Sequence, residues 1–393
     1  MENGRIVPDL ASLRATVNNE APVTKDAASR NIAAPATDQL EIALALSGGG
    51  ARAMAFHLGV LRYLAEQGML ERVSRVSTVS GGSLLVGLIF NQCNMNWPSS
   101  AGFVEQVYEP LRRQMSRRSL AFDAISKLAL PQNWRYALSR ANLIAKSLRD
   151  WGVTHCLKDL PTCPEWSING TTAETGRRFR FKRDSIGDWK SGYAHGGEFE
   201  LASAMAVSAA FPGLIGPLSI KTRTFSWMRR KEWDASKPAE PVTLPHKYLH
   251  LYDGGVYDNL GLEPYFDVGE QQPKIAGTVI YVSDAGAPLT HGRAPFFSLF
   301  RAKRLADIMS EQARTLRVRS FVGYLGRSGG AGAYTYIATK IRGGDQANAE
   351  LARDFPTNLS RMKVEVFDAI AGHGYAVAEE IERQYGLLAS LRR

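Results

Sequence analysis

A run of apolar residues at positions 42–46 has the pattern of a buried strand. In a parallel sheet covered on both faces, nearly every position of a strand is apolar, whereas a half-exposed strand alternates. From residue 53 to residue 68 the period changes, because Phe56, Val60 and Leu64 recur at helical spacing and a glycine stands where the helix would end. This stretch therefore predicts a strand, a short loop and a helix.

The succession of strand and helix is repeated directly afterwards. A short apolar strand at 76–79 runs into small residues, and an apolar helix at 83–90 follows. The order of strand, glycine loop, helix, strand, sharp turn and helix predicts a βαβ crossover, and hence an α/β fold with a parallel sheet.

The rest of the chain is predicted to add a helical insertion and further strands and helices. Residues 94–164 are rich in helix formers and tryptophan, and a helix over 104–128 is the clearest element there. The remaining predictions are two strands within 167–184 joined by a turn at Thr175 and Gly176, a helix from 201 to Pro212 and Gly213, strands over 247–253 and 278–284 that each end in Asp and Gly, and closing helices around 299–322 and 364–385.

The composition of the chain also indicates where in the cell the protein is expected. The first forty residues mix charges with Ala, Pro, Thr and Asn and lack the continuous apolar core of a secretory signal, so we interpret residues 1–40 as a mobile tail. No apolar stretch approaches the roughly 18 residues that cross a bilayer. We therefore expect a cytoplasmic protein that meets membranes only peripherally, while export by a route without an N-terminal signal stays open.

The three cysteines, Cys93, Cys156 and Cys163, are an odd number without paired-ligand spacing. They predict neither a disulfide framework nor a zinc site, and they fit a reducing compartment. No metal or cofactor is expected.

The net charge of +10 is concentrated in two stretches. Residues 221–233 interleave basic side chains with Phe225, Trp227 and Trp233, and residues 301–319 form a basic helix. A solvated face explains each stretch as well as binding does. Because the basic residues form no recognisable nucleic-acid module, we expect an anionic membrane surface as the partner rather than nucleic acid.

Candidate chemistry lies where the predicted strands end. Loops at the carboxyl ends of parallel strands meet at one edge of the sheet, which is where ligands bind. Ser80 stands between a strand and a helix beside Gly81 and Gly82, as in a nucleophile elbow, although Thr78 occupies the position of the first glycine in the Gly-x-Ser-x-Gly pattern. A capping serine in a tight turn is the alternative interpretation.

The glycines at 48–50 follow the first strand and open the first helix. Without side chains, Gly48, Gly49 and Gly50 allow backbone N–H groups to turn toward a developing oxyanion. A phosphate-binding loop would need Lys and Ser or Thr after the glycines, but Ala51 and Arg52 follow. An oxyanion hole is therefore the favoured interpretation.

Four segments in this order resemble the signatures of the patatin-like phospholipase family. They are LSGGGAR at 46–52, STVSGGS at 77–83, AVSAAFPGL at 206–214 and YDGGVYDN at 252–259. The resemblance spans about residues 44–284 and implies a three-layer α/β/α fold around a mostly parallel sheet, with one catalytic domain over 41–393 that includes the helical insertion. Thr78 is the departure from the family pattern.

The resemblance also implies a Ser–Asp dyad without histidine. Ser80 would be the nucleophile, Asp253 would accept its proton, and Gly48, Gly49 and Gly50 would hold the oxyanion. Arg52 would bind a lipid phosphate of the substrate or, alternatively, anchor the loop to a carboxylate within the fold.

Other titratable groups of the chain are alternatives to this dyad. The seven histidines are expected to be non-catalytic, although His57 lies one turn into the helix after the glycines and could reach the rim. His250 precedes Asp253 by three positions, which on a strand places the two side chains on opposite faces. Asp258 and Asp284 are the rival carboxylates, and Asp284 is the fallback base because it also ends a strand.

The function that follows is hydrolysis of a phospholipid or related lipid ester through an acyl-serine. Only the resemblance indicates lipid, and the serine, carboxylate and glycine loop indicate ester hydrolysis. The alternatives are a catalytically inactive lipid-binding or scaffold protein of the same fold and an esterase for small soluble esters. The sequence does not identify an activating partner.

Overall fold

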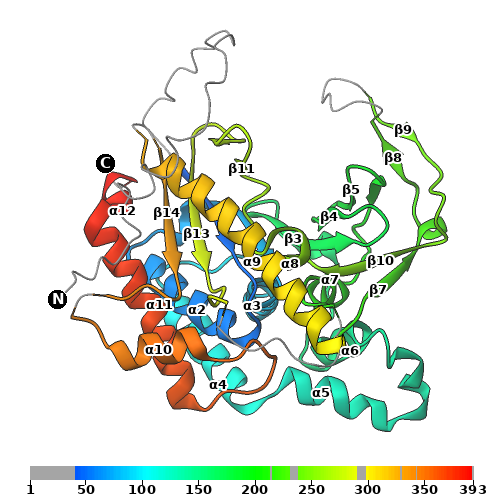
Figure 1. Ribbon diagram of the computed structural model, residues 1–393, viewed down its shortest axis with the longest axis horizontal. Coiled ribbons are helices and arrows are strands. Elements are labelled where there is room, and N and C mark those ends of the chain that lie inside the picture. Colours follow the sequence, from blue (N-terminus) through cyan, green and yellow to red (C-terminus); the bar gives the residue numbers. More distant parts are fainter. Residues whose placement is uncertain are drawn as a thin grey trace.

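The computed structural model describes residues 40–212, 215–230, 238–289, 298–327, 330–341 and 343–391 (Figure 1). The predicted tail lies outside the described residues except for Leu40, and so do Gly213 and Trp233.

A mixed sheet runs through the middle of the described part of the protein (Figure 1). Its order is β14-β13-β1-β2-β3-β4-β5-β6-β8-β9, and β10 pairs with both β3 and β7. The strands are β1 Glu41–Leu46, β2 Val73–Val79, β3 Glu165–Thr172, β4 Arg177–Phe181, β5 Ser185–Asp188, β6 Gly192–His195, β7 Leu218–Lys221, β8 Met228–Arg229, β9 Glu240–Pro241, β10 Tyr248–Asp253, β13 Thr278–Asp284 and β14 Gly332–Tyr336, while β11 Phe266–Asp267 and β12 Gln272–Pro273 form a separate ribbon. The block from β14 to β3 is parallel, as predicted, and the remaining pairs are antiparallel.

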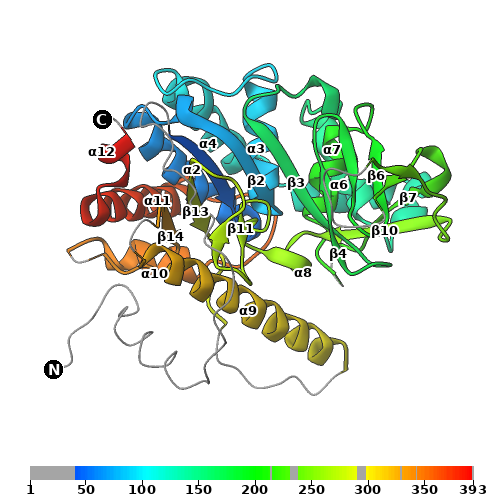
Figure 2. The ribbon, with the colours of Figure 1, turned by 90° about the horizontal axis from the view of Figure 1, so that it is seen from above.

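Helices cover both faces of the sheet (Figure 2). They are α2 Gly50–Glu66, α3 Gly81–Gln92, α4 Glu109–Arg117, α5 Leu120–Ser126, α6 Ala141–Asp150, α7 Leu201–Ser208, α8 Gly255–Asp258, α9 Ser298–Leu325, α10 Gln346–Asp354, α11 Val364–Tyr385 and α12 Leu387–Leu391. Single 3-10 turns lie at Leu70–Arg72, Lys127–Ala129, Pro131–Tyr136, Leu157–Asp159 and Thr222–Thr224, and a π turn lies at Val104–Tyr108.

The residues of β1 show why the fold has three layers. Leu44 and Leu46 point into a large apolar cluster that includes α2, α3 and α11. Ala43 and Ala45 point to the other face, into a smaller cluster with Phe321 of α9. Both faces of the strand are therefore buried, which explains its unbroken apolar sequence and confirms the predicted three-layer α/β/α architecture.

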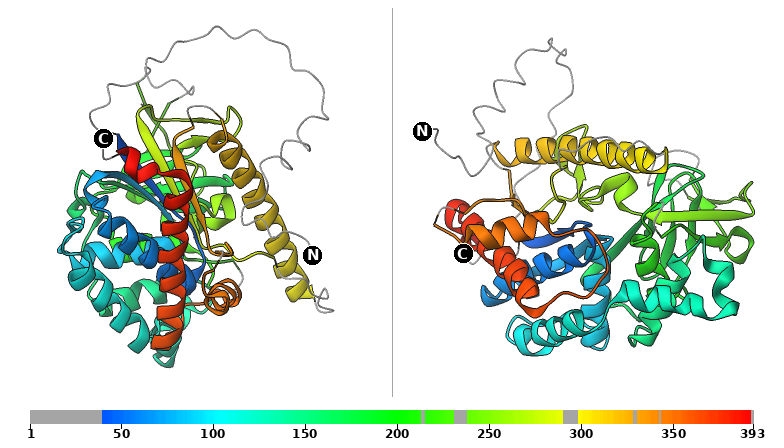
Figure 3. Two further views of the ribbon diagram at one scale, coloured as in Figure 1. Left: turned by 90° about the vertical axis from the view of Figure 1, so that its left-hand side faces the viewer. Right: turned by 60° about the horizontal axis from the view of Figure 1, so that its bottom comes forward.

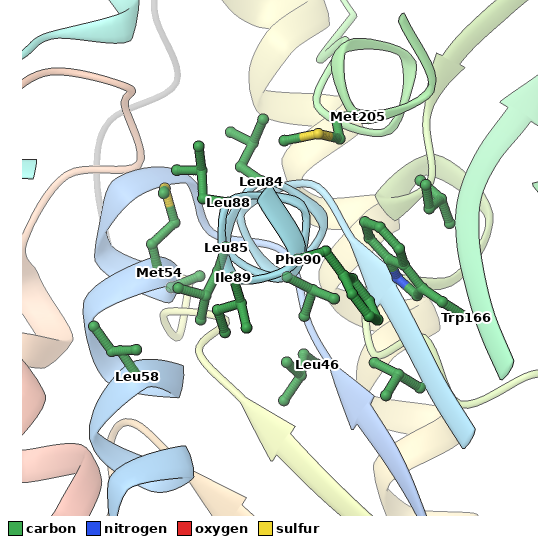
Figure 4. Packing of buried hydrophobic residues seen from close by; sticks show 14 of the residues in the cluster. Leu46, Met54, Leu58, Leu84, Leu85, Leu88, Ile89, Phe90, Trp166 and Met205 are labelled. Carbon is green, nitrogen blue, oxygen red and sulfur yellow. The ribbon is translucent and has the colours of Figure 1, made fainter. Parts of the chain in front are cut away.

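On the face with α2 and α3, the helices pack closely. α11 lies along α2 (Figure 3), and a Cβ atom at Gly59 of α2 would overlap the Ala371 carbonyl of α11. The helix α3 is buried from Gly81 to Phe90, and Figure 4 shows its side chains between Met54 of α2, Met205 of α7 and Trp166 of β3. An apolar helix buried on all sides fits the predicted run at 83–90.

The predicted helix over 104–128 is wrong in one respect, because it is broken near its middle. Arg118 is extended and ends α4, and Ser119 caps α5 by accepting a hydrogen bond from the Phe122 backbone N–H. A serine at this position competes with helix continuation and starts a new helix. The break turns α5 away from α4.

The strand that leads to Asp253 runs in the opposite direction from the one expected of a parallel sheet. β2 pairs with β3 from Glu165 to Asn169, and β10 occupies the same edge of β3 from Gly170 to Thr172 in the antiparallel sense. The carboxyl ends of β2 and β10 therefore meet head to head, with Val79 opposite Asn169 and Asp253 opposite Gly170. The predicted meeting of the two loops holds, but an antiparallel strand produces it.

In the part of the chain that the structure describes, no helix combines the length and apolar character needed to span a membrane.

Candidate active site

Ser80 occupies a strained turn between β2 and α3. Its backbone has φ 50° and ψ −116°, a conformation that a residue with a side chain rarely adopts. Small neighbours are required here, because a Cβ atom at Gly82 would lie 2.6 Å from the Leu46 carbonyl and one at Gly81 would overlap the Gly50 carbonyl. This is the geometry of a nucleophile elbow, in which strain exposes the serine hydroxyl at the end of the sheet.

Hydrogen bonds from α7 hold the turn. The Ser80 backbone N–H donates to the Ser208 hydroxyl at 3.0 Å, and that hydroxyl donates to the Asn169 carbonyl at 2.6 Å. Asn169 also ties β3 to β2, because its side-chain amide donates to the Thr78 carbonyl at 2.9 Å. The AVSAAFPGL segment thus supports the serine turn through Ser208, a role that the sequence alone did not assign.

Thr78, which stands in place of the first glycine of the Gly-x-Ser-x-Gly pattern, has a structural role. Its hydroxyl lies 2.7 Å from the Ser83 hydroxyl and accepts a hydrogen bond from the Trp166 indole at 2.9 Å. Ser83 in turn lies 2.8 Å from the Ser208 hydroxyl, so Thr78 belongs to the buried polar network that holds the turn.

We expect Thr78→Val to lower the free energy of unfolding by about 1–3 kcal/mol, because it leaves the buried Trp166 N–H and Ser83 hydroxyl without this partner. Thr78→Ser keeps the hydroxyl and is the matched control. Urea denaturation of both variants measures the difference, and equal stability of the two would contradict the role given to the hydroxyl.

Asp253 lies beside Ser80 in a buried position. Its carboxylate accepts a hydrogen bond from the Gly255 backbone N–H at 2.7 Å, and the Ser80 hydroxyl lies close enough to favour its charged form. Burial raises the pKa of Asp253 from an ordinary 3.8 to about 7, and the Gly255 N–H and the Ser80 hydroxyl oppose this shift. A carboxyl with a pKa near neutrality is suited to both accepting and returning a proton.

The glycine loop lies against both residues. A Cβ atom at Gly48 would lie 3.1 Å from the Ser80 Cβ and would overlap the Asn259 side chain. Gly49 and Gly50 have φ values of 146° and 62°, which glycine tolerates best. The loop therefore approaches Ser80 as closely as its sequence predicts.

The backbone N–H groups of the three glycines are not equally available as hydrogen-bond donors. The Gly48 N–H donates to the Asn259 carbonyl at 3.0 Å, so this donor is used within the fold. Gly50 begins α2, where N–H groups lack helical partners and the helix dipole favours negative charge. The Gly48 N–H is therefore not available as an oxyanion donor, which leaves the N–H groups of Gly49 and Gly50 as the candidates among the three expected glycines. Gly48 contributes space, and Asn259, the last residue of the YDGGVYDN segment, is a site neighbour that the sequence analysis left without a role.

Arg52 is committed to the fold. Its side chain is 3% exposed, and its guanidinium donates to the Phe355 carbonyl at 2.6 Å and to the Ala285 carbonyl at 3.1 Å. Burial lowers the pKa of Arg52 to about 10. These contacts disagree with a substrate-binding Arg52 and favour the alternative role as a loop anchor, with backbone carbonyls in place of the expected carboxylate.

Arg52→Met is expected to lower the free energy of unfolding by about 2–4 kcal/mol, because the substitution removes the guanidinium that donates hydrogen bonds to the carbonyls of Ala285 and Phe355. Thermal or urea unfolding measures this loss. A variant of unchanged stability that selectively loses affinity for anionic headgroups would instead support substrate binding.

The rival carboxylates have other partners. Asp284 is fully buried, where it pairs with Arg314 and accepts a hydrogen bond from the Tyr334 hydroxyl at 2.7 Å. Asp258 accepts the backbone N–H groups of Leu260 and Glu263 at 3.0 and 2.8 Å. Both carboxylates therefore stabilise the fold at the sheet end and the α8 turn.

His57 is buried below the rim. Its ring nitrogens lie 2.7 Å from the Ser283 hydroxyl and 2.9 Å from the Ser47 carbonyl. Burial lowers the pKa of His57 to about 4, so the ring is neutral at pH 7. His250 is exposed and contacts Glu174 on the opposite face from Asp253, as the strand period predicts.

Trp227, within the basic stretch at 221–233, is not available for contact with a membrane. Trp227 is buried, and its indole N–H donates to the Thr222 carbonyl at 2.8 Å. Packing of the indole against the apolar cluster removes it from any surface, while Met228 and Arg229 beside it are exposed.

A small apolar cavity lies next to the site. Ala51 of the glycine loop, Leu84 of α3 and Leu120 of α5 are among its lining residues. Its volume of about 20 Å³ holds little more than one water molecule, so an acyl chain would enter only after side chains move. Within the described ranges, no three His, Cys, Asp or Glu side chains are grouped to hold a metal ion.

Comparisons with solved structures give the fold. The structure of human GIVD cytosolic phospholipase A2 aligns with a TM-score of 0.50 and 13% identity, covering 90% of this chain and 60% of that chain. The same human protein in complex with methyl gamma-linolenyl fluorophosphonate aligns with a TM-score of 0.49 and 14% identity over 90% and 58% of the two chains. VipD from Legionella pneumophila aligns with a TM-score of 0.40 and 13% identity over 89% and 68%. The chain thus spans about 60% of the length of the human phospholipase chain.

The comparison with curated proteins gave no match. A family model described as patatin-like phospholipase matches residues 44–265, which is more than half of the chain and includes both Ser80 and Asp253. The chain belongs to the patatin-like phospholipase family.

Proposed function

We propose that the protein is a serine acyl hydrolase that cleaves ester bonds of phospholipids or related lipids with a Ser80–Asp253 dyad. The observation that carries this proposal is the buried Asp253 carboxylate beside the Ser80 hydroxyl at a strained turn. A serine hydroxyl needs an adjacent base to become a nucleophile, and a carboxylate within hydrogen-bond reach supplies one.

The first half of the reaction forms an acyl-serine. Ser80 Oγ attacks the ester carbonyl carbon while its proton passes to the Asp253 carboxylate. The carbonyl oxygen becomes an oxyanion and accepts hydrogen bonds from the Gly49 and Gly50 N–H groups. As the intermediate collapses, the bond to the alcohol oxygen breaks, and Asp253 returns the proton to that oxygen.

The second half releases the acyl group. A water molecule gives a proton to Asp253 and attacks the acyl carbonyl carbon through the same oxyanion geometry. The bond to Ser80 Oγ breaks, the serine recovers the proton from Asp253, and a fatty acid leaves. One carboxyl group thus serves in turn as base and acid, which fits its pKa near 7.

An esterase for small soluble esters is the second candidate, because the cavity of about 20 Å³ beside the glycine loop does not hold an acyl chain without rearrangement. Mass spectrometry of products from diacyl phospholipid vesicles and from short-chain nitrophenyl esters separates the candidates. Release of fatty acid and lysophospholipid supports the lipid hydrolase, and turnover of the short esters alone supports the esterase. Absence of both products, with no adduct on Ser80 after fluorophosphonate treatment, would support the inactive scaffold.

A further inference from the structure

A concentrated set of exposed apolar side chains follows the break at Ser119. Its members are between 49% and 88% exposed, and we call them the α5 surface: Phe122, Ile125, Leu130, Trp134 and Leu138. Isolated apolar residues are common on protein surfaces, but a contiguous group of large ones marks an interaction site.

The segment that carries the α5 surface is compact. The Trp134 indole donates to the Leu128 carbonyl at 2.9 Å, and the Asn133 amide donates to the Lys127 carbonyl at 2.8 Å. These contacts join the turn at Pro131–Tyr136 to the turn at Lys127–Ala129 that directly follows α5, so the apolar side chains belong to one compact segment. This unit protrudes at the lower edge of the molecule in Figure 1, the edge toward which β13 and β14 point.

The end of α4 and this segment are together strongly basic. Residues 112–140 contain seven Lys or Arg residues and one Asp, which gives a net charge of +6. Arg113, Arg117 and Arg135 are among the exposed members. Apolar and aromatic side chains surrounded by cations match a bilayer surface that carries anionic headgroups.

The α5 surface is connected to the candidate active site. The Ala121 N–H of α5 donates to the Leu359 carbonyl at 2.9 Å, and the neighbouring Asn358 carbonyl accepts the Ala51 N–H of the glycine loop at 2.7 Å. Leu120 of α5 also lines the apolar cavity beside Ala51. A lipid chain that enters this cavity would therefore lie beside the residue that follows the glycines.

We propose that the α5 surface docks the protein on an anionic lipid bilayer, with α5 delivering lipid toward Ser80. This inference rests on the proposed function, because a lipid hydrolase must reach substrate at a bilayer. α9 also exposes apolar side chains at Leu305, Met309 and Leu316. The α5 surface differs because it contains aromatic residues and because Leu120, on the same helix, lines the cavity, so α9 supplies the control.

Co-sedimentation of the full chain with vesicles tests the proposal. Wild type is expected to bind vesicles of phosphatidylcholine and phosphatidylglycerol far more tightly than vesicles of phosphatidylcholine alone, by roughly fivefold for each Lys or Arg that reaches the surface. Phe122→Ser/Leu138→Ser is expected to weaken binding at least about tenfold, and Trp134→Ser to weaken it by several-fold. The control Leu305→Ser/Leu316→Ser should bind as wild type does, and circular dichroism checks the fold of each variant.

Docking and catalysis can fail separately in this experiment. Ser80→Ala is expected to bind vesicles like wild type, so binding by this variant reports docking without hydrolysis. If wild type binds anionic vesicles but releases no fatty acid, the docking surface stands and the proposed function fails. Unchanged binding of Phe122→Ser/Leu138→Ser, equal binding of wild type to both vesicle types, or a larger loss in the α9 control would overturn the α5 assignment.

Discussion

Ser80→Ala is expected to reduce lipid ester hydrolysis by roughly 10⁴-fold or more, to the limit of detection, and to prevent fluorophosphonate labelling. The reason is that the Ser80 hydroxyl is the proposed nucleophile, and removal of a nucleophile eliminates the covalent route entirely. Release of fatty acid from phospholipid vesicles measures the loss.

The substitution leaves the fold almost unchanged. Alanine meets the same backbone strain at φ 50° as serine does, and the backbone N–H that donates to Ser208 is retained. Ser320→Ala is the matched control, because Ser320 lies on α9 and its hydroxyl donates to the Val268 carbonyl. Substantial hydrolysis by Ser80→Ala with wild-type stability would contradict the assignment of the nucleophile.

Asp253→Asn is expected to lower hydrolysis by about 10²–10⁴-fold, because an amide of the same shape cannot accept the proton of Ser80. The Asn side-chain oxygen can still accept the Gly255 N–H, so the turn after β10 is preserved. Steady-state hydrolysis at pH 8 measures the loss, and activity near the wild-type level would exclude Asp253 as the base.

The same substitution is expected to stabilise the protein at alkaline pH. The pKa of Asp253 is raised from 3.8 to about 7 by burial, so the native state binds the proton more tightly than the unfolded state. The stability that this group contributes is greatest below about pH 4 and is lost as pH rises through 7. Asn carries no such penalty, so its advantage grows between these pH values, toward a limit of about 4 kcal/mol.

Urea denaturation of wild type and Asp253→Asn from pH 4 to pH 8 measures this difference. A growing gap in favour of the Asn variant, together with lost activity, would identify a carboxylate that is kept for function at a cost in stability. A gap that shrinks with rising pH would mean that Asp253 is stabilised as a carboxylate by the fold.

Local sequence patterns were sufficient to predict the strands and helices at the centre of the fold. The run at 42–46 is apolar because β1 is buried on both faces, and the small residues after Val79 follow from the crowding of Gly81 and Gly82 against neighbouring backbone. These constraints act within a few residues of the chain, so they are visible in one sequence.

Features that depend on contacts between residues far apart in the sequence could not be predicted in the same way. The apolar pattern of β10 is the same whether the strand runs parallel or antiparallel to β3. The sequence around Arg52 is equally compatible with binding of a phosphate and with hydrogen bonds to the carbonyls of Ala285 and Phe355. The sequence around Trp227 is likewise compatible with an exposed and with a buried indole. Each of these outcomes depends on contacts with residues far away in the sequence.

The most direct test is the rate at which a fluorophosphonate labels Ser80 as a function of pH. In this reaction Ser80 Oγ bonds to phosphorus and fluoride leaves, so the rate reports activation of the hydroxyl without a lipid surface. We expect an adduct on Ser80 whose rate of formation rises with pH through a midpoint near 7 in wild type, and a slow rate without that midpoint in Asp253→Asn. An adduct on another residue, or equal rates in the two proteins at every pH, would contradict it.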